Sequence, residues 1–411
     1  MTSSTILFVI IFIVLADYLL ERLLAFVNCR NISTDLPAAL QGIYSPEKYR
    51  LSQEYQRANC RFDLVASTFT VVVLLALLLS GGFAVLDAAA RGMVNGELPV
   101  ALLFFGLLFV GADLLFLPFA LYRTFVIEER FAFNKTTLAT FLTDKLKGWF
   151  LTIALAGPLL AAVIWFYQVT QSLFWIYAWL LMGGFMIFMT MFYSSLIVPL
   201  FNKQTPLPEG ELRRAVEHVS RRSSFQLDNI FVIDGSRRST KANAYFSGLG
   251  AKKRIVLYDT LIDDLQIEEL VAVLAHEIGH YQKKHSRQGI IIGLGQTGIM
   301  LYILSLFIAN PLLSHALGAS SHSFHLALVS FAILYAPLST CMGVATNSLS
   351  RANEYEADRF AAAHGHAAPL AAALKKLSTR NLSNLTPHPA YVFFHYSHPP
   401  LLDRLRALTA T

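Results

Sequence analysis

Seven long apolar stretches dominate the sequence, and each is long enough to cross the hydrocarbon core of a bilayer as a helix. They lie at about residues 4–26, 63–86, 99–122, 149–168, 173–198, 287–309 and 323–348. Only 15% of the residues are charged, whereas a typical soluble protein has about 25%. We therefore expect a mainly α, polytopic membrane protein with seven transmembrane helices.

Two of these stretches carry further information. The stretch at 4–26 has no basic segment before it and no small-residue cleavage site after it, so we predict a membrane helix and not a cleaved signal peptide. Only a few polar residues separate the fourth stretch from the fifth, which predicts a tight helical hairpin.

Lysine and arginine gather in alternate connecting segments. The segments 27–62 and 123–148 contain five each, whereas 87–98, 169–172 and 310–322 contain one or none. The positive-inside rule then places the N-terminus outside and the C-terminus in the cytosol. This bias explains the net charge of +6, so the charge indicates no nucleic-acid partner.

The segment LVAVLAHEIGHYQKKH contains an HExxH motif formed by His276, Glu277 and His280. Histidines four residues apart on a helix project from one face and can hold one zinc ion together. Glu277 would then lie beside a metal-bound water and could take its proton. The motif predicts a zinc hydrolase with its metal site just before the sixth span, at the cytoplasmic end of the membrane helices.

A third zinc ligand is expected elsewhere, because catalytic zinc usually has three protein ligands and one open position. In SRANEYEADRFAAAHG, Glu354 and Asp358 share one helical face, whereas Glu356 points away. We predict that Glu354 is the third ligand and that Asp358 accepts the free ring N–H of a ligating histidine. The alternative is an ordinary helix whose three carboxylates face water.

The segment between the fifth and sixth spans has the character of a soluble domain. Residues 209–223 are predicted to form an amphipathic helix, and DNIFVIDG, KANAYFSG and KRIVLYD a small antiparallel sheet. The run Asn243, Ala244 and Tyr245 is the candidate edge for binding an extended substrate by strand addition. A sheet strand without substrate contact is equally compatible with the pattern.

Polar residues in apolar surroundings give weaker indications. In the tail, His398 and Arg404 could stabilise an oxyanion, or they could be a surface histidine and a helix-end arginine. Asp17 and Asp113 lie within predicted spans, which indicates a wet cavity, ion transport or, as we favour, helix packing.

The chain has three cysteines, Cys29, Cys60 and Cys341. An odd count with two cysteines in predicted cytosolic loops argues against a disulfide framework.

Six motifs in this order (EERFAFNKTT, VPLFNKQTPLPEGEL, DGSRRSTKANAYFSG, HEIGH, NEYEAD and HYSHPPLLDRL) resemble those of the type I CAAX prenyl proteases, integral-membrane zinc metalloproteases. The resemblance covers nearly the whole chain. It implies seven helices around a large hydrophilic chamber, with a zincin-like catalytic domain at the cytoplasmic cap. It also implies one zinc ion per chain and removal of the last residues of a CAAX tail.

By position, the resemblance makes His276, His280 and Glu354 the zinc ligands, Glu277 the catalytic base and Asp358 the residue behind a ligand. Asn243 with Ala244 matches the strand that binds substrate backbone, and His398 and Arg404 match a polar pair near the metal. The short 310–322 segment and the tail LTAT, which lacks a retrieval signal, predict a bacterial relative in the inner membrane. A eukaryotic chain would lie in the endoplasmic reticulum.

The expected organisation has four parts. Residues 1–200 carry the first five spans, 201–285 the catalytic segment, 286–350 the last two spans and 351–411 the segment that completes the zinc site. The expected partners are peptide or protein substrates, prenylated or not, and the lipid bilayer. Two rival functions remain: a quality-control protease of the same chemistry, and a transporter or receptor with a structural zinc.

Overall fold

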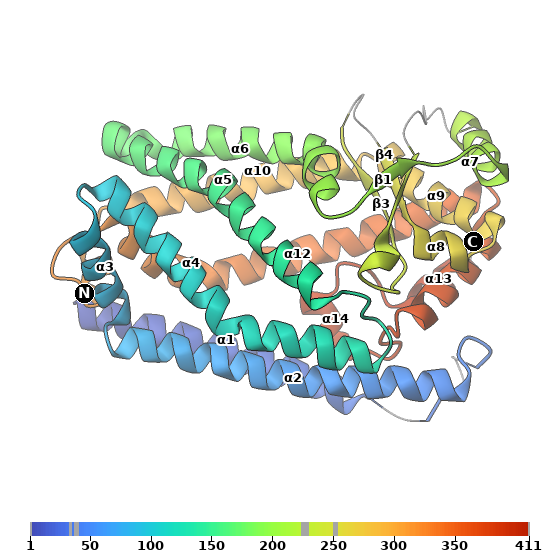
Figure 1. The fold of residues 1–411 in the computed structure, drawn as a ribbon, viewed down its shortest axis with the longest axis horizontal. Coiled ribbons are helices and arrows are strands. Elements are labelled where there is room, and N and C mark those ends of the chain that lie inside the picture. The colour runs from blue at the N-terminus through green and yellow to red at the C-terminus, as the bar shows by residue number, and fades with distance from the viewer. Residues whose placement is uncertain (1, 33–34, 37–40, 223–229, 250–253, 410–411) are drawn as a thin grey trace.

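The computed structural model describes residues 2–409 except 33–34, 37–40, 223–229 and 250–253. The protein is mainly helical and elongated, and its long helices run along the longest axis (Figure 1). In the described part of the chain, six helical stretches are long and apolar enough to cross a membrane. They are Ser3–Arg30, Pro46–Leu79, Glu97–Glu128, Leu138–Leu200, His285–Phe307 and Phe324–Ala363. The prediction of a polytopic, mainly helical membrane protein is confirmed.

The long helices reach beyond the apolar stretches of the sequence. They are α1 (Ser3–Arg30), α2 (Pro46–Leu79), α4 (Glu97–Tyr122), α5 (Leu138–Thr170), α6 (Phe174–Phe192), α10 (His285–Phe307) and α12 (Phe324–Ala363). The stretch Leu138–Leu200 contains both α5 and α6, which pack against each other across the turn η3 (Gln171–Leu173). A π-helical turn, η2 (Arg123–Glu128), extends α4, and η4 (Tyr193–Ile197) and η5 (Val198–Leu200) follow α6.

Shorter helices lie at the two ends of the molecule. α3 (Gly82–Met93) and α11 (Pro311–Ala316) connect spans at the end that holds the N-terminus (Figure 1). At the other end lie α7 (Glu211–Arg222), α8 (Asp259–Asp264), α9 (Ile267–Gln282), α13 (Ala367–Arg380), α14 (Pro389–His395) and α15 (Leu401–Thr409). The amphipathic helix predicted at 209–223 corresponds to α7.

Several helices begin where the sequence provides a capping side chain. The Ser45 side chain accepts a hydrogen bond from the Lys48 N–H, and Pro46 occupies the first turn of α2, where its missing N–H costs nothing. Gln266 and Glu269 form a reciprocal capping box at the start of α9. The helix that carries the HExxH motif therefore has a well-defined first turn.

The sheet is mixed, so the prediction of an antiparallel sheet is wrong in part. Its strands are β1 (Gln204–Pro206), β2 (Ile230–Ile233), β3 (Ala244–Ser247) and β4 (Arg254–Tyr258), in the order β1-β2-β4-β3. β4 lies between β2 and β3, pairing parallel with β2 and antiparallel with β3. The three predicted strands are present, but the sequence pattern carried no information on their spatial order. β1 was not predicted.

The buried apolar side chains form two main clusters, one near each end. The first includes Ile10, Phe104 and Phe174, and the second, beneath the sheet, includes Leu257 and Leu274. Between them the membrane helices bury little, since only 6% to 17% of the most apolar window of each is buried. Most residues in these apolar parts of the helices therefore face lipid or interior space.

The structure contains one disulfide, between Cys29 at the end of α1 and Cys60 on α2, with Cα atoms 6.4 Å apart. The expectation of no disulfide is therefore wrong. An odd number of cysteines excludes only complete pairing, and the packing of α1 against α2 brings these two together. Cys341 is free.

Asp113 on α4 has partners on the neighbouring helix. Lys145 donates to both of its carboxylate oxygens at 2.7 Å, and the Trp149 indole donates to Oδ2 at 2.7 Å. This contact between α4 and α5 agrees with the helix-packing interpretation of Asp113.

Candidate metal centre and active site

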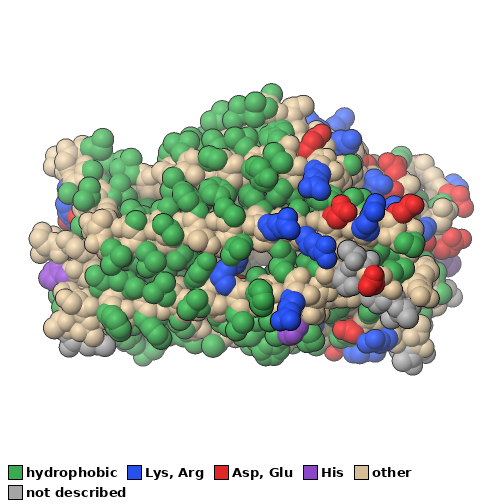
Figure 2. Space-filling view, turned by 90° about the horizontal axis from the view of Figure 1, so that it is seen from below, with side chains coloured by type: hydrophobic (Ala, Val, Ile, Leu, Met, Phe, Trp, Pro, Cys, Tyr) green, Lys and Arg blue, Asp and Glu red, His purple; other side chains and the backbone are tan. Residues whose placement is uncertain are grey.

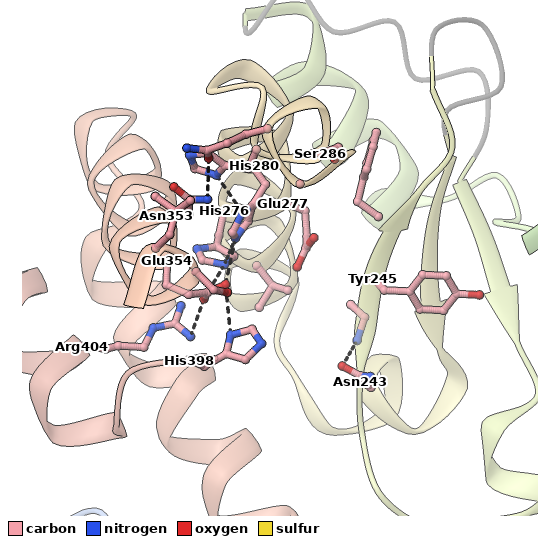
Figure 3. Close-up of a pocket in the computed structure, with 18 of the residues that line it drawn as sticks. Asn243, Tyr245, His276, Glu277, His280, Ser286, Asn353, Glu354, His398 and Arg404 are labelled. Atoms are coloured by element: carbon pink, nitrogen blue, oxygen red, sulfur yellow. Dashed lines mark hydrogen bonds and ion pairs between the residues drawn. The ribbon is translucent and has the colours of Figure 1, made fainter. Parts of the chain in front are cut away.

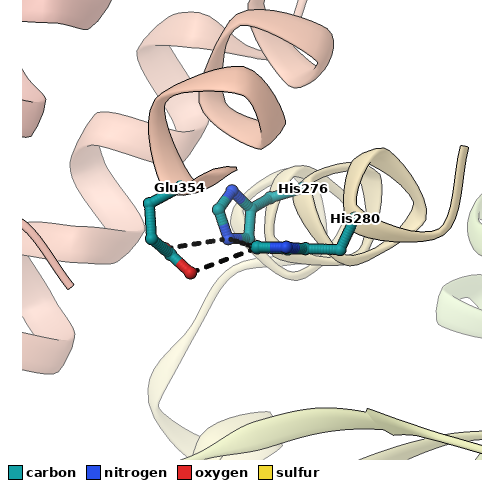
Figure 4. A group of neighbouring side chains, drawn as sticks. All are labelled: His276, His280 and Glu354. Carbon is teal, nitrogen blue, oxygen red and sulfur yellow. Dashed lines mark hydrogen bonds and ion pairs between the residues drawn. The ribbon is translucent and has the colours of Figure 1, made fainter. Parts of the chain in front are cut away.

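His276 and His280 project from one face of α9, as their spacing requires. Their Nε2 atoms lie 3.2 Å apart and face the Glu354 carboxylate of α12 (Figure 4). His276 and Glu354 are buried. The helix predicted to carry Glu354 is thus brought directly against the helix of the HExxH motif.

Gly279 explains how α12 comes so close to α9. A Cβ atom at this position would lie 3.1 Å from the Ala357 Cα, 3.2 Å from its carbonyl oxygen and 3.2 Å from the Phe360 Cβ. These contacts are tighter than ordinary van der Waals contacts, so only glycine fits without a shift. The glycine of HEIGH therefore allows Glu354 to reach the histidines.

The three donor groups fit one zinc ion. Zinc bonds of about 2.0–2.2 Å at tetrahedral angles place neighbouring donor atoms about 3.3–3.6 Å apart. The Glu354 carboxylate lies 3.5 Å from His276 Nε2 and 3.2 Å from His280 Nε2, which completes a triangle of this size. Among the described residues, no fourth His, Cys, Asp or Glu joins the group. Three protein donors with one further position is the pattern of catalytic zinc.

Asp358 and Arg404 support the donor triangle from behind. Asp358 Oδ1 lies 2.9 Å from His276 Nδ1, the ring nitrogen that does not face the metal position. Arg404 donates to both Asp358 oxygens at 2.9 and 2.6 Å, and its Nη1 lies 3.3 Å from Glu354. Burial alone would lower the pKa of Arg404, but these carboxylates raise it above its ordinary value.

His285 and Glu356 hold the ring of His280 in a comparable way, and the sequence analysis did not predict this role for either residue. His285 Nδ1 lies 3.0 Å from His280 Nδ1, and His285 Nε2 lies 3.3 Å from Glu356. Lys284 has a positive φ of 61°, and this turn between α9 and α10 directs His285 back to the metal centre. The histidine that follows KK in HEIGHYQKKH was the available signal.

Glu277 lies beside the ligands on the wall of a cavity between α9 and β3 (Figure 3). Burial raises the pKa of Glu277, while the imidazoles of His276 and His280 act in the opposite direction. For His276, burial lowers the pKa, but hydrogen bonds to Asp358 and Glu354 outweigh it and raise the pKa to about 9. Metal binding at this histidine therefore releases a proton.

His398 reaches the centre from the C-terminal segment. Its Nδ1 lies 3.0 Å from Glu354 Oε1, and its side chain is 66% exposed to the cavity and solvent. The structure thus brings both His398 and Arg404 to the Glu354 carboxylate. Arg404 is buried, whereas His398 is exposed.

The cavity has a volume of about 800 Å³ and extends from the metal centre along the first half of α10 and the part of α12 between Thr346 and Glu354. Asn243, which directly precedes β3, lines it across from Glu277 (Figure 3). Ala244, the first residue of β3, lines it as well. β3 is an edge strand of the sheet, paired only with β4. Just before it, the Asn243 carbonyl accepts a hydrogen bond from the Tyr258 N–H. In an antiparallel ladder the next residue, Ala244, then directs its backbone groups away from β4. Its N–H is bound by the Asn243 side chain.

Tyr245, the second residue of β3, also lines the cavity. Its ring points away from the metal ligands (Figure 3), and its hydroxyl lies 3.5 Å from Ser194 Oγ.

Comparisons with known proteins agree with this geometry. Residues 26–203 match the family described as CAAX prenyl protease N-terminal, five membrane helices, and residues 206–411 match peptidase family M48. The "CAAX prenyl protease 1 homolog" of Arabidopsis thaliana is 38% identical over 382 residues, covering 91% of this chain and 90% of that protein. The "CAAX prenyl protease 1" of Saccharomyces cerevisiae is 34% identical over 421 residues, covering 96% and 93%.

A crystal structure of S. mikatae Ste24p has the same fold, with a TM-score of 0.94, 32% sequence identity and coverage of 98% of this chain and 99% of that one. The curated relatives compared come from plants, fungi, animals and Dictyostelium discoideum, all of them eukaryotic. The expectation of a bacterial relative therefore has no support.

Proposed function

The chain belongs to the CAAX prenyl protease 1 family of M48 zinc metallopeptidases, and from this premise we propose that it removes the C-terminal aaX tripeptide of prenylated CAAX proteins. The observation that carries the proposal is the His276, His280 and Glu354 triangle beside Glu277 in a cavity lined by an edge strand. We assign one zinc ion per chain to this triangle.

The proposed chemistry uses Glu277 as general base. Zinc, when bound, acidifies a water ligand and polarises the scissile carbonyl. Glu277 takes the proton of the attacking water and passes it to the leaving amine. His398, exposed to the cavity within reach of Glu354, is suited to stabilise the oxyanion.

We propose a different role for Arg404 from the oxyanion stabilisation considered above. Its guanidinium is buried and engaged with Asp358 and Glu354. A guanidinium held in this way fixes the positions of the two carboxylates. Asp358 in turn orients His276 for metal binding.

Substrate binding is proposed at β3. An extended peptide that adds beside Asn243 and Ala244 would run across the cavity in front of Glu277. The Asn243 side chain, which binds the Ala244 N–H, would have to release it to the incoming backbone. Tyr245 also lines the cavity, so we keep Asn243, Ala244 and Tyr245 as the proposed substrate-binding residues.

Three features of the membrane part remain proposals. We propose seven spans, because α5 and α6 are each long enough to cross a bilayer and pack as a hairpin. A hydrophilic chamber between them is supported by the cavity that extends from the metal centre past polar side chains of α10 and α12, such as Gln296 and Thr346. The lysine and arginine distribution supports an outside N-terminus and a catalytic end in the cytosol, and we retain the four-part division at 200, 285 and 350.

The test compares the wild type with Glu277→Gln, using a farnesylated CAAX peptide and its unmodified form. We expect Glu277→Gln to keep zinc in one-to-one stoichiometry and to lose activity by about a thousandfold or more. His364→Gln, a change at an exposed histidine after α12, is the matched control. Retained cleavage by Glu277→Gln would contradict the mechanism. Equal rates on the two peptides would contradict recognition of the prenyl group and favour the quality-control alternative.

A further inference from the structure

A second cavity lies between α2 and the junction of α4 with η2, away from the metal centre. It has a volume of about 640 Å³. Its walls combine three arginines, Arg57, Arg61 and Arg130, with apolar and aromatic side chains. We name this cavity the arginine groove. We propose that it binds the headgroup of an anionic phospholipid, with an acyl chain along its apolar wall.

The apolar part is built from both helices. Phe62 stacks on Tyr122 with ring centroids 5.8 Å apart, and Phe119 packs against Phe62 at 6.2 Å. Val65 and Phe119 belong to apolar stretches that are long enough to cross a membrane. This wall therefore continues from the groove into the hydrocarbon layer, where an acyl chain would lie.

The polar part carries uncompensated positive charge. Arg57, Arg61 and Arg130 are exposed, and no ion pair joins them to a carboxylate within the described ranges. Glu54, which also lines the groove, lies 3.8 Å from Arg50. Glu128 is engaged by Lys241 at 2.8 Å and Tyr55 at 2.6 Å. The nearby carboxylates thus have other partners.

Arg57 and Arg61 lie just before the apolar run of α2, and Arg130 lies just after the apolar stretch Glu97–Glu128, so all three flank segments that would cross the membrane. Figure 2 shows Lys and Arg side chains gathered between the hydrophobic part of this face and the end that also carries acidic side chains. Arginine binds phosphate oxygens through paired, charge-assisted hydrogen bonds. A phosphate among three guanidinium groups would relieve their mutual repulsion, and cations next to a membrane attract anionic lipid.

The backbone of the groove is irregular on one side. Pro118 lies inside α4, and the next turns from Arg123 to Glu128 are π-helical. Such widened turns are frequent at functional sites. Here they place Val126 and Ile127 on the groove wall.

The charge complementarity favours a phospholipid over the isoprenoid of a substrate, which would need the apolar wall but not the arginines. The apolar wall, in turn, favours a lipid over free phosphate, because free phosphate would use the arginines but not the wall. The proposal does not depend on the peptidase mechanism, so binding alone tests it.

The experiment is native mass spectrometry of the full-length protein in detergent with equal amounts of phosphatidylserine and phosphatidylcholine of matched acyl chains. We expect the wild type to retain phosphatidylserine preferentially, and Arg61→Gln with Arg130→Gln to reduce that preference by about tenfold or more. Arg61→Lys with Arg130→Lys should keep most of it. The matched control is Lys135→Gln with Lys147→Gln, which removes the same charge outside the groove.

Several results would overturn the proposal. They are no preference in the wild type, an unchanged preference in the glutamine variant, an equal loss in the control, and displacement of phosphatidylserine by inorganic phosphate alone. Displacement by farnesol, with equal farnesol binding to the glutamine variant, would also overturn it, because the occupant would then be an isoprenoid. Unchanged thermal unfolding and zinc content establish that the variants are folded.

Discussion

The two histidines of the metal centre each offer one ring nitrogen to the metal position and the other to a supporting residue. His276 uses a carboxylate, Asp358, whereas His280 uses the imidazole of His285. A zinc ion at Nε2 would leave the proton of His280 on Nδ1, to be donated to His285 Nδ1 at 3.0 Å, and His285 would then donate its Nε2 proton to Glu356 at 3.3 Å. This chain of contacts sets the tautomer and ring orientation of His280.

We therefore expect His285→Ala to weaken zinc binding by about 10- to 100-fold, because supporting residues of this kind contribute that much to metal affinity. Competition with a chromogenic chelator measures the affinity directly. His285→Asn, whose amide oxygen can accept the same proton, should recover part of it. His364→Ala is the control, and zinc affinity equal to wild type in His285→Ala would rule out the supporting role.

At the scale of elements, the centre depends on the distance between α9 and α12. Gly279 lies directly against Ala357 of α12, with no room for a Cβ atom between them. Because α9 carries both histidines and α12 carries Glu354, any separation of these helices opens the donor triangle. The packing of two helices is thus a condition for metal binding.

For Gly279→Ala we expect α12 to move outward by a few tenths of an ångström, zinc affinity to fall by about tenfold, and the free energy of unfolding to fall by about 1–3 kcal/mol from overpacking. Gly295→Ala on α10, where a Cβ meets no atom within 4 Å, is the matched control. It should be neutral or slightly stabilising, because alanine is the better helix former. Unchanged zinc affinity in Gly279→Ala would show that α12 can adjust without cost.

At the scale of the whole molecule, the metal centre lies at one end, and the fold does not depend on it for a core. The apolar cluster near the N-terminal end contains no residue of the centre, and the cluster beneath the sheet is formed by side chains such as Leu257 and Leu274. A metal that closes a fold usually has four protein ligands, often cysteines. This centre has three donors from two helices that also contact each other through Gly279 and Ala357.

Removal of zinc by a chelator should therefore abolish peptidase activity and leave the helix content unchanged. The midpoint of thermal unfolding should fall by a few degrees, because a ligand that binds the folded state adds about 3 kcal/mol at a hundred times its dissociation constant. Circular dichroism and activity before and after re-addition of zinc measure both effects. A large loss of helix on chelation would instead identify a structural zinc.

Local patterns in the sequence were sufficient for the elements and for most of the centre. The spacing of His276 and His280, and of Glu354 and Asp358, predicts which side chains share a helical face, and the structure has them so. Hydropathy predicts the membrane helices because lipid offers the backbone no hydrogen-bond partner. These are properties of single elements, and each is encoded within about twenty residues.

Only the tertiary structure decided what depends on contacts between distant segments. The parallel pairing of β2 with β4, the Cys29–Cys60 disulfide and the engagement of Arg404 with two carboxylates each join residues whose proximity no local pattern encodes. His285 reaches His280 only because the backbone turns at Lys284. By itself, the sequence determined the helices and the metal-binding chemistry of this protein, because periodicity and spacing act within a single element. Packing decided the strand order, the disulfide pairing and the residues that support the metal ligands, because these depend on which surfaces meet.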